Sequence, residues 1–163
     1  MRRLILTLIL CLGIRTFASG ATYKVPADEP IARVRIPDKW KTEKHDEFVE
    51  ATSPDGTVHF LVMRPEGNKI SEGMGETMRY LRGKGGITVD ARSLKNEPGK
   101  LNGMDIRNIS WDATDQSGPV KIRFRVISFA RNEHLLVACW SPPEAEKKHS
   151  AEVDKMLQSI KKL

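Results

Sequence analysis

The feature that most constrains the fold is a series of three strand-like segments in the second half of the chain. Residues 104–112, 120–130 and 134–141 are rich in β-branched and aromatic side chains, and only short polar turns at 115–118 and 131–132 separate them. Turns this short join antiparallel neighbours, because parallel strands need a long crossover connection. The sequence therefore predicts an antiparallel sheet that contains a three-stranded meander.

Further strands are predicted before this meander. Residues 32–36 alternate apolar and basic side chains and end at Pro37. Residues 47–52 and 57–63 flank the segment Ser53-Pro54-Asp55-Gly56, in which proline and glycine favour the backbone angles of a tight turn. We expect a hairpin here, and because both of its faces carry apolar residues, we expect both faces to be partly covered.

Two helices are predicted. Residues 71–82 carry an apolar stripe that includes Met78, and Ser71 is the expected N-cap. The segment Ser141-Pro142-Pro143-Glu144, with Ser141 as the expected N-cap, is a strong start signal for a second helix, which should continue to about residue 160. Between the first helix and the meander, the same kinds of signal predict a strand at 87–94 and then a loop around Pro98-Gly99 and Asn102-Gly103.

The best packing of these elements places one helix against each face of the antiparallel β-sheet. This arrangement would explain why both faces of the hairpin carry apolar residues. The fold class is therefore predicted as α+β, an α/β/α sandwich. With 163 residues, the chain is long enough for one such domain with a substantial core.

The N-terminus has the pattern of a secretory signal peptide. Arg2 and Arg3 precede an almost unbroken apolar stretch at 4–14, which is too short to span a bilayer. Small residues follow, and cleavage is expected after Ala18 or Gly20. An uncleaved anchor or a buried first helix is the alternative, which the length of the stretch disfavours. We therefore expect an exported protein, periplasmic or extracellular, with no stable membrane span after cleavage.

Export changes how charge and cysteine content are interpreted. The whole chain carries a net charge of +6, and loss of the three arginines in the first 20 residues would leave +3, which gives little reason to expect nucleic acid as a partner. Cys11 would leave with the signal, so Cys139 would remain alone and form no internal disulfide. The expected organisation is a signal peptide at 1–20, an irregular lead-in at 21–31 and a single α+β domain at 32–163.

This order of elements resembles the PsbP-like superfamily. The likeness rests on the short strand ending in Pro37-Asp38-Lys39-Trp40, the hairpin, the mid-chain helix, the meander, and the closing helix ending in Met156-Leu157-Gln158-Ser159-Ile160. The superfamily includes thylakoid-lumen accessory subunits of photosystem II, small exported bacterial proteins of the DcrB type and nuclear Ran-binding proteins. The resemblance covers about residues 32–163 and implies a binding or accessory role. It implies no particular site residue.

The candidate binding surface is a basic strand face. Lys121, Arg123 and Arg125 alternate with apolar residues, so they share one face of their strand. A two-residue turn would place Arg123 opposite Trp140, and Arg107 would lie on the preceding strand. Such a surface could bind an anionic or carboxylate-bearing partner, with a cation–π contribution from the indole. A solvated strand face that prevents unwanted association is the simpler interpretation.

The four histidines give little indication of a catalytic or metal site. No two of them have the i, i+4 spacing of a helical zinc site. The run His45-Asp46-Glu47 could supply ligands from a loop, although a solvated strand entry explains it more simply. His59 is expected opposite Glu50 as an ordinary cross-strand pair. His134 is expected to be exposed, and His149 to be partly buried at the edge of its helix.

Other reactive-looking features also have structural interpretations. Cys139 lies in a very apolar strand and is expected to be a buried thiol rather than a nucleophile. Gly83-Lys84-Gly85-Gly86 follows a helix, whereas phosphate loops precede one, so a helix C-cap is expected. No cofactor or metal is expected.

Besides a structural domain whose partner alone defines its role, two functional hypotheses remain. The first is an exported, non-enzymatic accessory or binding protein of the cell envelope, whose partner is an unknown envelope protein or a small anionic ligand. The alternative is a hydrolase or metal-dependent enzyme that uses the region of His45 to Glu47 together with His59.

Overall fold

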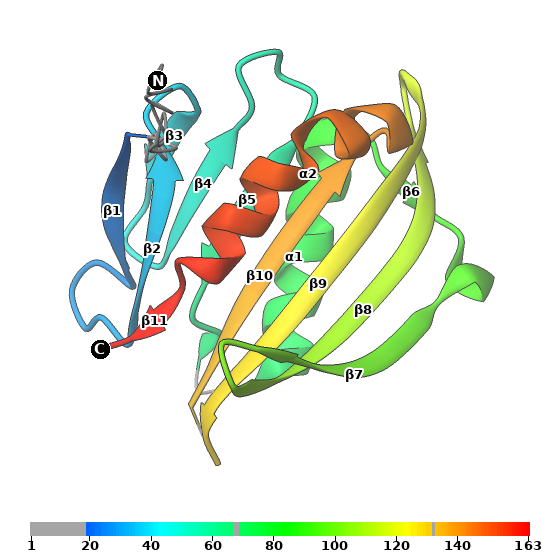
Figure 1. Cartoon of the computed structure of the whole chain (residues 1–163). Coiled ribbons are helices and arrows are strands. Elements are labelled where there is room, and N and C mark those ends of the chain that lie inside the picture. The colour runs from blue at the N-terminus through cyan, green and yellow to red at the C-terminus, as the bar shows by residue number, and fades with distance from the viewer. Residues whose placement is uncertain (1–18, 67–68, 132) are drawn as a thin grey trace, which may run out of the picture.

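The meander lies at the centre of an eight-stranded antiparallel sheet in the computed structural model, which describes residues 19–66, 69–131 and 133–163 (Figure 1). The strands of this sheet are β3 (Lys41–Lys44), β4 (Phe48–Thr52), β5 (His59–Met63), β6 (Thr88–Val89), β7 (Lys95–Leu101), β8 (Met104–Asp115), β9 (Gly118–Ala130) and β10 (Glu133–Ser141). They follow the order β3-β4-β5-β10-β9-β8-β6, and β7 pairs with another part of β8. The predicted hairpin and the predicted meander are confirmed. Most of the predicted signal peptide, residues 1–18, lies outside the described residues.

A second sheet corrects the expectation of an irregular lead-in at 21–31. Its three strands are β1 (Gly20–Val25), β2 (Ala32–Pro37) and β11 (Lys161–Lys162), with β2 in the middle. Gly20 allows the close approach of β1 to β2, because a Cβ atom there would lie 2.7 Å from the carbonyl oxygen of Ile36. The prolines of the lead-in mark only the connection that follows β1.

The two predicted helices are present, with different caps. They are α1 (Ile70–Gly85) and α2 (Pro143–Gln158). Lys69, not Ser71, is the N-cap of α1 and offers no side-chain cap, whereas Gly86 ends the helix in the left-handed conformation, with a φ of 61°. The N-cap of α2 is Pro142 rather than Ser141. No helix in the described ranges is both long and apolar enough to cross a membrane.

The helices pack against different residues of β10. Leu136 and Ala138 belong to a buried cluster that includes Leu81 of α1. Val137 and Cys139 belong to another, which includes Met156 of α2 and the apolar residues of β2. In Figure 1, α2 crosses in front of the sheet and α1 lies behind it. The apolar residues on both faces of the hairpin are explained by these two clusters.

The segment between α1 and β8 differs most from expectation. The strand predicted at 87–94 is reduced to β6, followed by a single 3-10 turn, η2 (Ala91–Ser93), which Asp90 caps through its side chain. The loop predicted around Pro98-Gly99 is instead part of β7. Proline within a sheet occurs mainly on edge strands, and β7 is one, because it pairs with a neighbour on one side only.

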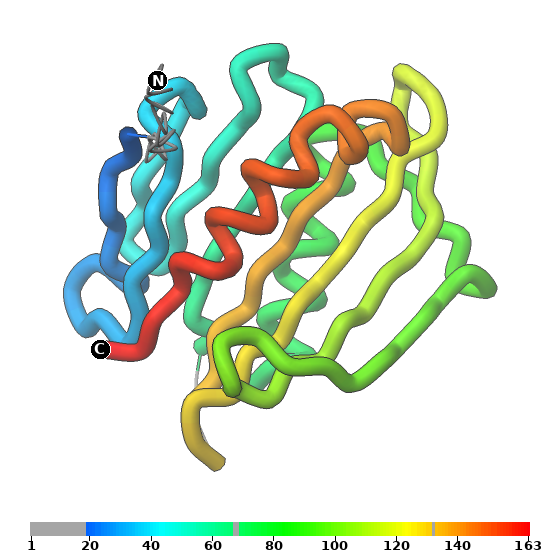
Figure 2. Tube along the Cα trace, in the orientation of Figure 1, coloured from blue at the N-terminus to red at the C-terminus, as the bar shows by residue number. Residues whose placement is uncertain are grey.

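The position of α2 leaves part of the sheet without a helix. The trace in Figure 2 shows α2 crossing β5 and β10, whereas no helix crosses the front of β8. The side chains of β8 and β9 that point to this front side therefore border an open region beside α2.

Candidate functional site

The structure brings together three of the five residues predicted as a binding surface. Lys121, Arg123 and Arg125 lie on the face of β9 that is turned toward α2, because their cross-strand partners on β10 are Ser141, Cys139 and Val137, respectively. Trp140 pairs with Ile122 and Arg107 pairs with Val126, so both belong to the opposite face of the sheet. The cation–π contact between Trp140 and the basic strand face is therefore excluded.

A β-bulge explains why Trp140 was placed on the wrong face. Glu133 pairs with Ala130, as a two-residue turn requires, but the register then shifts and His134 pairs with Ser128. One extra residue on β9 moves every later side chain of β10 to the other face relative to β9. Arg123 consequently faces Cys139 instead of Trp140. The bulge follows the turn and has no clear signal in the sequence.

Arg123 and Arg125 border a groove between β7, β8 and β9, on the part of the sheet without a helix. The groove has a volume of about 310 Å³. Its polar lining comes from all three strands: Lys95, Glu97, Asn108, Ser110, Arg123 and Arg125. Lys95 and Glu97 were missed because their strand was predicted as a loop. The polar residues at alternate positions of β8 are the signal that could have identified Asn108 and Ser110.

Arg125 differs from the other two cations in its surroundings. Lys121 forms an ion pair with Asp112, with 3.2 Å between the charged atoms, and Arg123 forms one with Glu146 of α2. Arg125 is half-buried, and burial lowers the pKa of its guanidinium. It makes no side-chain hydrogen bond or ion pair with any described residue. Lys95, the third basic group of the groove, is exposed to solvent, so Arg125 is the half-buried cation there with capacity for an external anion.

A second polar cluster surrounds Glu50 on the α1 side of the sheet. Its carboxylate is 2% exposed, accepts a hydrogen bond from the Tyr80 hydroxyl at 2.6 Å and pairs with the Lys84 ammonium at 2.8 Å. Burial alone would raise the pKa of Glu50, but hydrogen bonds with His59, Lys84 and Tyr80 outweigh it and lower the pKa to about 2. The predicted pairing of His59 opposite Glu50 is wrong by two residues.

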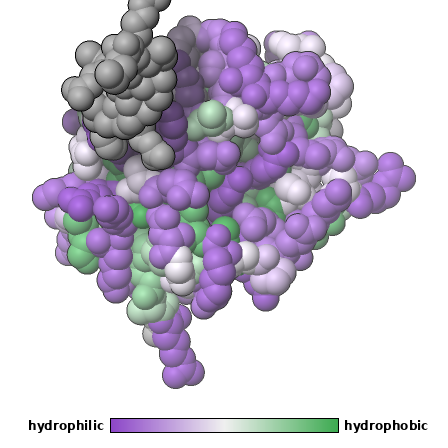
Figure 3. Space-filling model, viewed as in Figure 1, coloured by the Kyte–Doolittle hydropathy of each residue, from purple (hydrophilic) through white to green (hydrophobic). Residues whose placement is uncertain are grey.

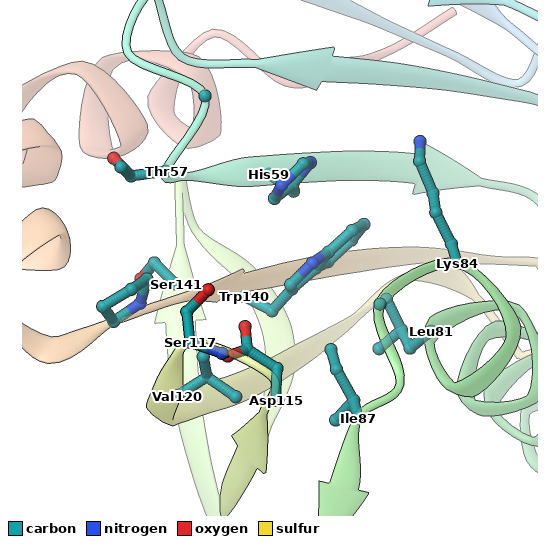
Figure 4. Close-up of a pocket in the computed structure, with 13 residues that line it drawn as sticks. Thr57, His59, Leu81, Lys84, Ile87, Asp115, Ser117, Val120, Trp140 and Ser141 are labelled. Atoms are coloured by element: carbon teal, nitrogen blue, oxygen red, sulfur yellow. The ribbon is translucent and has the colours of Figure 1, made fainter.

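The register of the hairpin explains this error. Thr52 lies opposite His59, and Glu50 lies opposite Leu61, because the chain reverses over six residues rather than four. His59 still reaches Glu50 diagonally, with 3.5 Å between Nδ1 and Oε1. Its ring stacks on Trp140, with the centroids 4.7 Å apart and the planes nearly parallel. Both rings line a pocket at this end of the sheet (Figure 4).

The region proposed for an enzyme does not come together. His45 is exposed and stacks on Phe48, which pairs with Met63, whereas His59 lies at the other end of the hairpin. Within the ranges that the structure describes, no group of three or more His, Cys, Asp or Glu side chains is placed to hold a metal ion. Cys139 is a buried free thiol, as predicted, and burial raises its pKa to about 11.

The remaining histidines have structural contacts. His149 is more deeply buried than predicted and lies between two carboxylates, those of Asp55 and Glu152. His134 was expected to be exposed but is half-buried, and its Nδ1 lies 3.1 Å from the hydroxyl of Ser128.

Only the comparison of structures, and not that of sequences, finds known proteins that resemble this one. No protein-family model matches the sequence, and no curated protein matches it significantly in sequence. The solution structure of cyanobacterial PsbP (CyanoP) from Synechocystis sp. PCC 6803 is similar, with a TM-score of 0.57 at 10% identity, over 95% of this chain and 99% of that one. LpqN, a protein involved in cell envelope biogenesis of Mycobacterium tuberculosis, has a TM-score of 0.53 at 6% identity, over 88% and 91% of the two chains.

A larger protein contains the same fold as a part. A crystal structure from Bacteroides thetaiotaomicron has a TM-score of 0.58 at 11% identity. The match covers 88% of this chain but only 48% of that protein, so this chain spans about half of its length. At these identities the similarity concerns the fold, which is PsbP-like.

Proposed function

We propose that the protein is an exported, non-enzymatic accessory or binding protein of the cell envelope, and that its groove between β7, β8 and β9 binds a carboxylate-bearing partner. The observation that carries this proposal is the half-buried Arg125, which has no acceptor among the described residues. A guanidinium that is removed from water without an acceptor destabilises the protein, and a bound carboxylate would offset that cost.

The surroundings of Arg125 fit a carboxylate group. A guanidinium can donate two parallel hydrogen bonds to a carboxylate. Asn108 pairs directly with Arg125 across the sheet, and Ser110 is the next residue on the same face of β8. Both side chains offer further donors. Glu97, on the rim, would disfavour partners with dense negative charge.

The character of the surface favours a polar partner. Figure 3 shows that this side of the molecule is mainly hydrophilic, with small apolar areas between polar side chains. A docking surface for an apolar segment would need a larger continuous apolar patch. We therefore favour an acidic segment of an envelope protein over a small anionic ligand, and nucleic acid is not proposed.

The envelope location rests on the N-terminal pattern of two arginines, an apolar stretch and small residues. The PsbP-like fold is compatible with it, since LpqN, which shares the fold, is involved in cell envelope biogenesis. An α/β/α sandwich with one helix on each face, and kinship with the small exported proteins of the DcrB type, belong to the same proposal. In this sandwich, the two helices leave the β8 side of the sheet available for binding.

The test is affinity capture of the tagged protein from the envelope fraction of its native host, followed by mass spectrometry. The decisive variant is Arg125→Gln, which removes the charge and keeps a polar side chain of similar shape. Arg107→Gln is the matched control, because Arg107 is exposed on the opposite face of the same sheet. We expect capture to fall about tenfold for Arg125→Gln and to be unchanged for Arg107→Gln.

The outcomes separate the possible partners. Loss of one specific protein with Arg125→Gln supports the proposal. If neither form captures a protein but succinate binds the wild type and not the variant, the partner is a small anion and the accessory role is wrong. Equal capture by both variants would place the binding surface elsewhere.

A further inference from the structure

The pocket beside α1 is separate from the arginine groove. It opens at one end of the sheet, where the C-terminal end of α1, the turn between β8 and β9 and the loop after β4 meet. Its volume is about 360 Å³. Figure 4 shows its side chains arranged around the ring of Trp140, which lies next to the ring of His59. Nothing in the proposed carboxylate binding uses this pocket.

Trp140 presents an unsatisfied donor in this pocket. The residue is 6% exposed, and its indole N–H makes no hydrogen bond to any residue that the structure describes. Trp40 is an internal comparison, because its equally buried indole donates to Glu152 at 2.9 Å. Buried indole N–H groups normally have a partner. The unsatisfied N–H of Trp140 therefore points to a missing acceptor.

The missing partner of this indole is an acceptor, because the indole N–H can only donate. Ser141 also lines the pocket, but it alternates with Trp140 along β10, so its side chain lies on the α2 face of the sheet. An uncharged carbonyl oxygen is the kind of acceptor that a largely apolar pocket admits.

The rest of the lining is largely apolar, and its charged side chains already have partners within the protein. Leu81, Ile87 and Val120 form an apolar wall. The ammonium of Lys84 is paired with Glu50. The carboxylate of Asp115 accepts the backbone N–H groups of Ser117 at 2.7 Å and Gly118 at 3.0 Å. With Lys84 paired and the Asp115 carboxylate bonded to backbone N–H groups, the pocket favours an uncharged ligand over an anion.

The ring of His59 fixes the geometry of this site. It stacks on Trp140, and its Nδ1 lies 3.3 Å from the hydroxyl of Thr52 as well as near Glu50. The indole is thus held from one side, so the pocket is formed before any ligand arrives.

We propose that this pocket binds a small uncharged molecule with an apolar ring and a carbonyl group. The carbonyl oxygen accepts from the Trp140 indole N–H, and the ring packs against Ile87 and Val120. The site lies on the opposite face of the sheet from Arg125, so it functions independently of the groove.

The test uses N-benzylacetamide as the probe and the protein as residues 19–163, the form expected after cleavage at Ala18. In NMR spectra of ¹⁵N-labelled protein, the indole N–H signal of Trp140 should shift as N-benzylacetamide is added to millimolar concentration. The indole N–H signal of Trp40, which already donates to Glu152, should not shift. The variant Trp140→Phe keeps an aromatic ring and removes the donor. It should lower the affinity about tenfold.

Two further variants keep the result interpretable. Trp111→Phe changes a tryptophan of the same sheet outside the pocket lining and should leave the affinity unchanged. Ser117→Tyr fills the rim from an exposed position without altering the core, so it should abolish binding even if Trp140→Phe folds poorly. Absence of a Trp140 shift in the wild type, or equal affinity for Ser117→Tyr, would overturn the proposal. Stronger binding of phenylacetate than of the amide would also contradict it.

Discussion

At the scale of single residues, His149 connects three separate parts of the fold. Its Nε2 lies 2.9 Å from Asp55 in the loop after β4, and its Nδ1 lies 3.1 Å from Glu152 of α2, which also accepts from Trp40. With a carboxylate at each ring nitrogen, the protonated imidazolium satisfies both contacts. The hydrogen bond with Asp55 is the main cause of a raised pKa at His149, against the opposing effect of burial.

This raised pKa predicts a loss of stability at alkaline pH. A group whose pKa is higher in the folded state stabilises the fold fully below its unfolded pKa, and this contribution disappears as pH rises through the folded value. We expect His149→Gln to lower the free energy of unfolding by about 1 to 2 kcal/mol near pH 6 and by less near pH 9. Urea denaturation at both pH values measures the difference.

The exposed His45 provides the control for this experiment. His45→Gln should leave the pH dependence unchanged, because that ring is exposed to solvent and stacks on the side chain of Phe48. A wild-type stability that stays constant between the two pH values would contradict the role assigned to His149.

The contribution of Glu50 to stability has the opposite pH dependence. Its pKa falls from 4.5 to about 2 on folding, so its contribution is present above about pH 4.5 and is lost as pH falls toward 2. Removing one partner of a buried pair is costly, although solvent exposure of Lys84 reduces the penalty. We expect Glu50→Gln to destabilise the protein by about 2 kcal/mol near neutral pH.

The difference between wild type and Glu50→Gln should shrink in acid. Guanidinium denaturation near pH 7 and near pH 3 would show this, with the exposed Glu47→Gln as the matched control. A constant difference at both pH values would mean that the carboxylate charge is not what Tyr80 and Lys84 stabilise.

At the scale of elements, α2 joins the two sheets. Met156 of this helix is fully buried in a cluster that contains residues of β2 and of β10. Met156→Ala would leave a cavity where these three elements meet, and the expected loss is about 3 kcal/mol. The exposed neighbour Lys155→Ala should have little effect. Thermal unfolding of the two variants tests this, and equal melting temperatures would contradict the central position of α2.

The elements also show how far the sequence could predict the fold. The meander, the hairpin and both helices follow from strand alternation, turn residues and apolar stripes, because these signals are local. β7 and β1 could not be predicted in the same way. Pro98 and the prolines after Val25 suggest loops, and only a neighbouring strand, β8 or β2, makes these segments extended.

The candidate site was also predicted only in part, because some of its features depend on local patterns and others on contacts with distant elements. Alternation alone places Lys121, Arg123 and Arg125 on one face, which the structure confirms. The position of Trp140 depends on a bulge near the turn, and the ion pairs of Lys121 and Arg123 depend on β8 and α2. Arg125 differs from Lys121 and Arg123 because it lacks such an ion pair with any described residue. This difference arises from the packing of distant elements, and no sequence pattern predicts it.

At the scale of the whole molecule, the two faces of one sheet have different chemistry. The groove beside α2 contains a half-buried cation with no partner among the described residues, and the pocket beside α1 contains an unsatisfied indole donor. The charge of the chain is consistent with an acidic partner, since even without the first 20 residues it stays positive, at +3. The central claim is that the groove meets an acidic protein partner in the cell envelope.

Site-specific photo-crosslinking in intact cells tests this claim most directly. The photo-reactive residue p-benzoylphenylalanine replaces either Ser110, in the groove, or Arg107, on the other face of the same strand. The account predicts a crosslinked protein in the envelope fraction from position 110 and none from position 107. A crosslink from position 107 alone, or no crosslink from position 110, would contradict it.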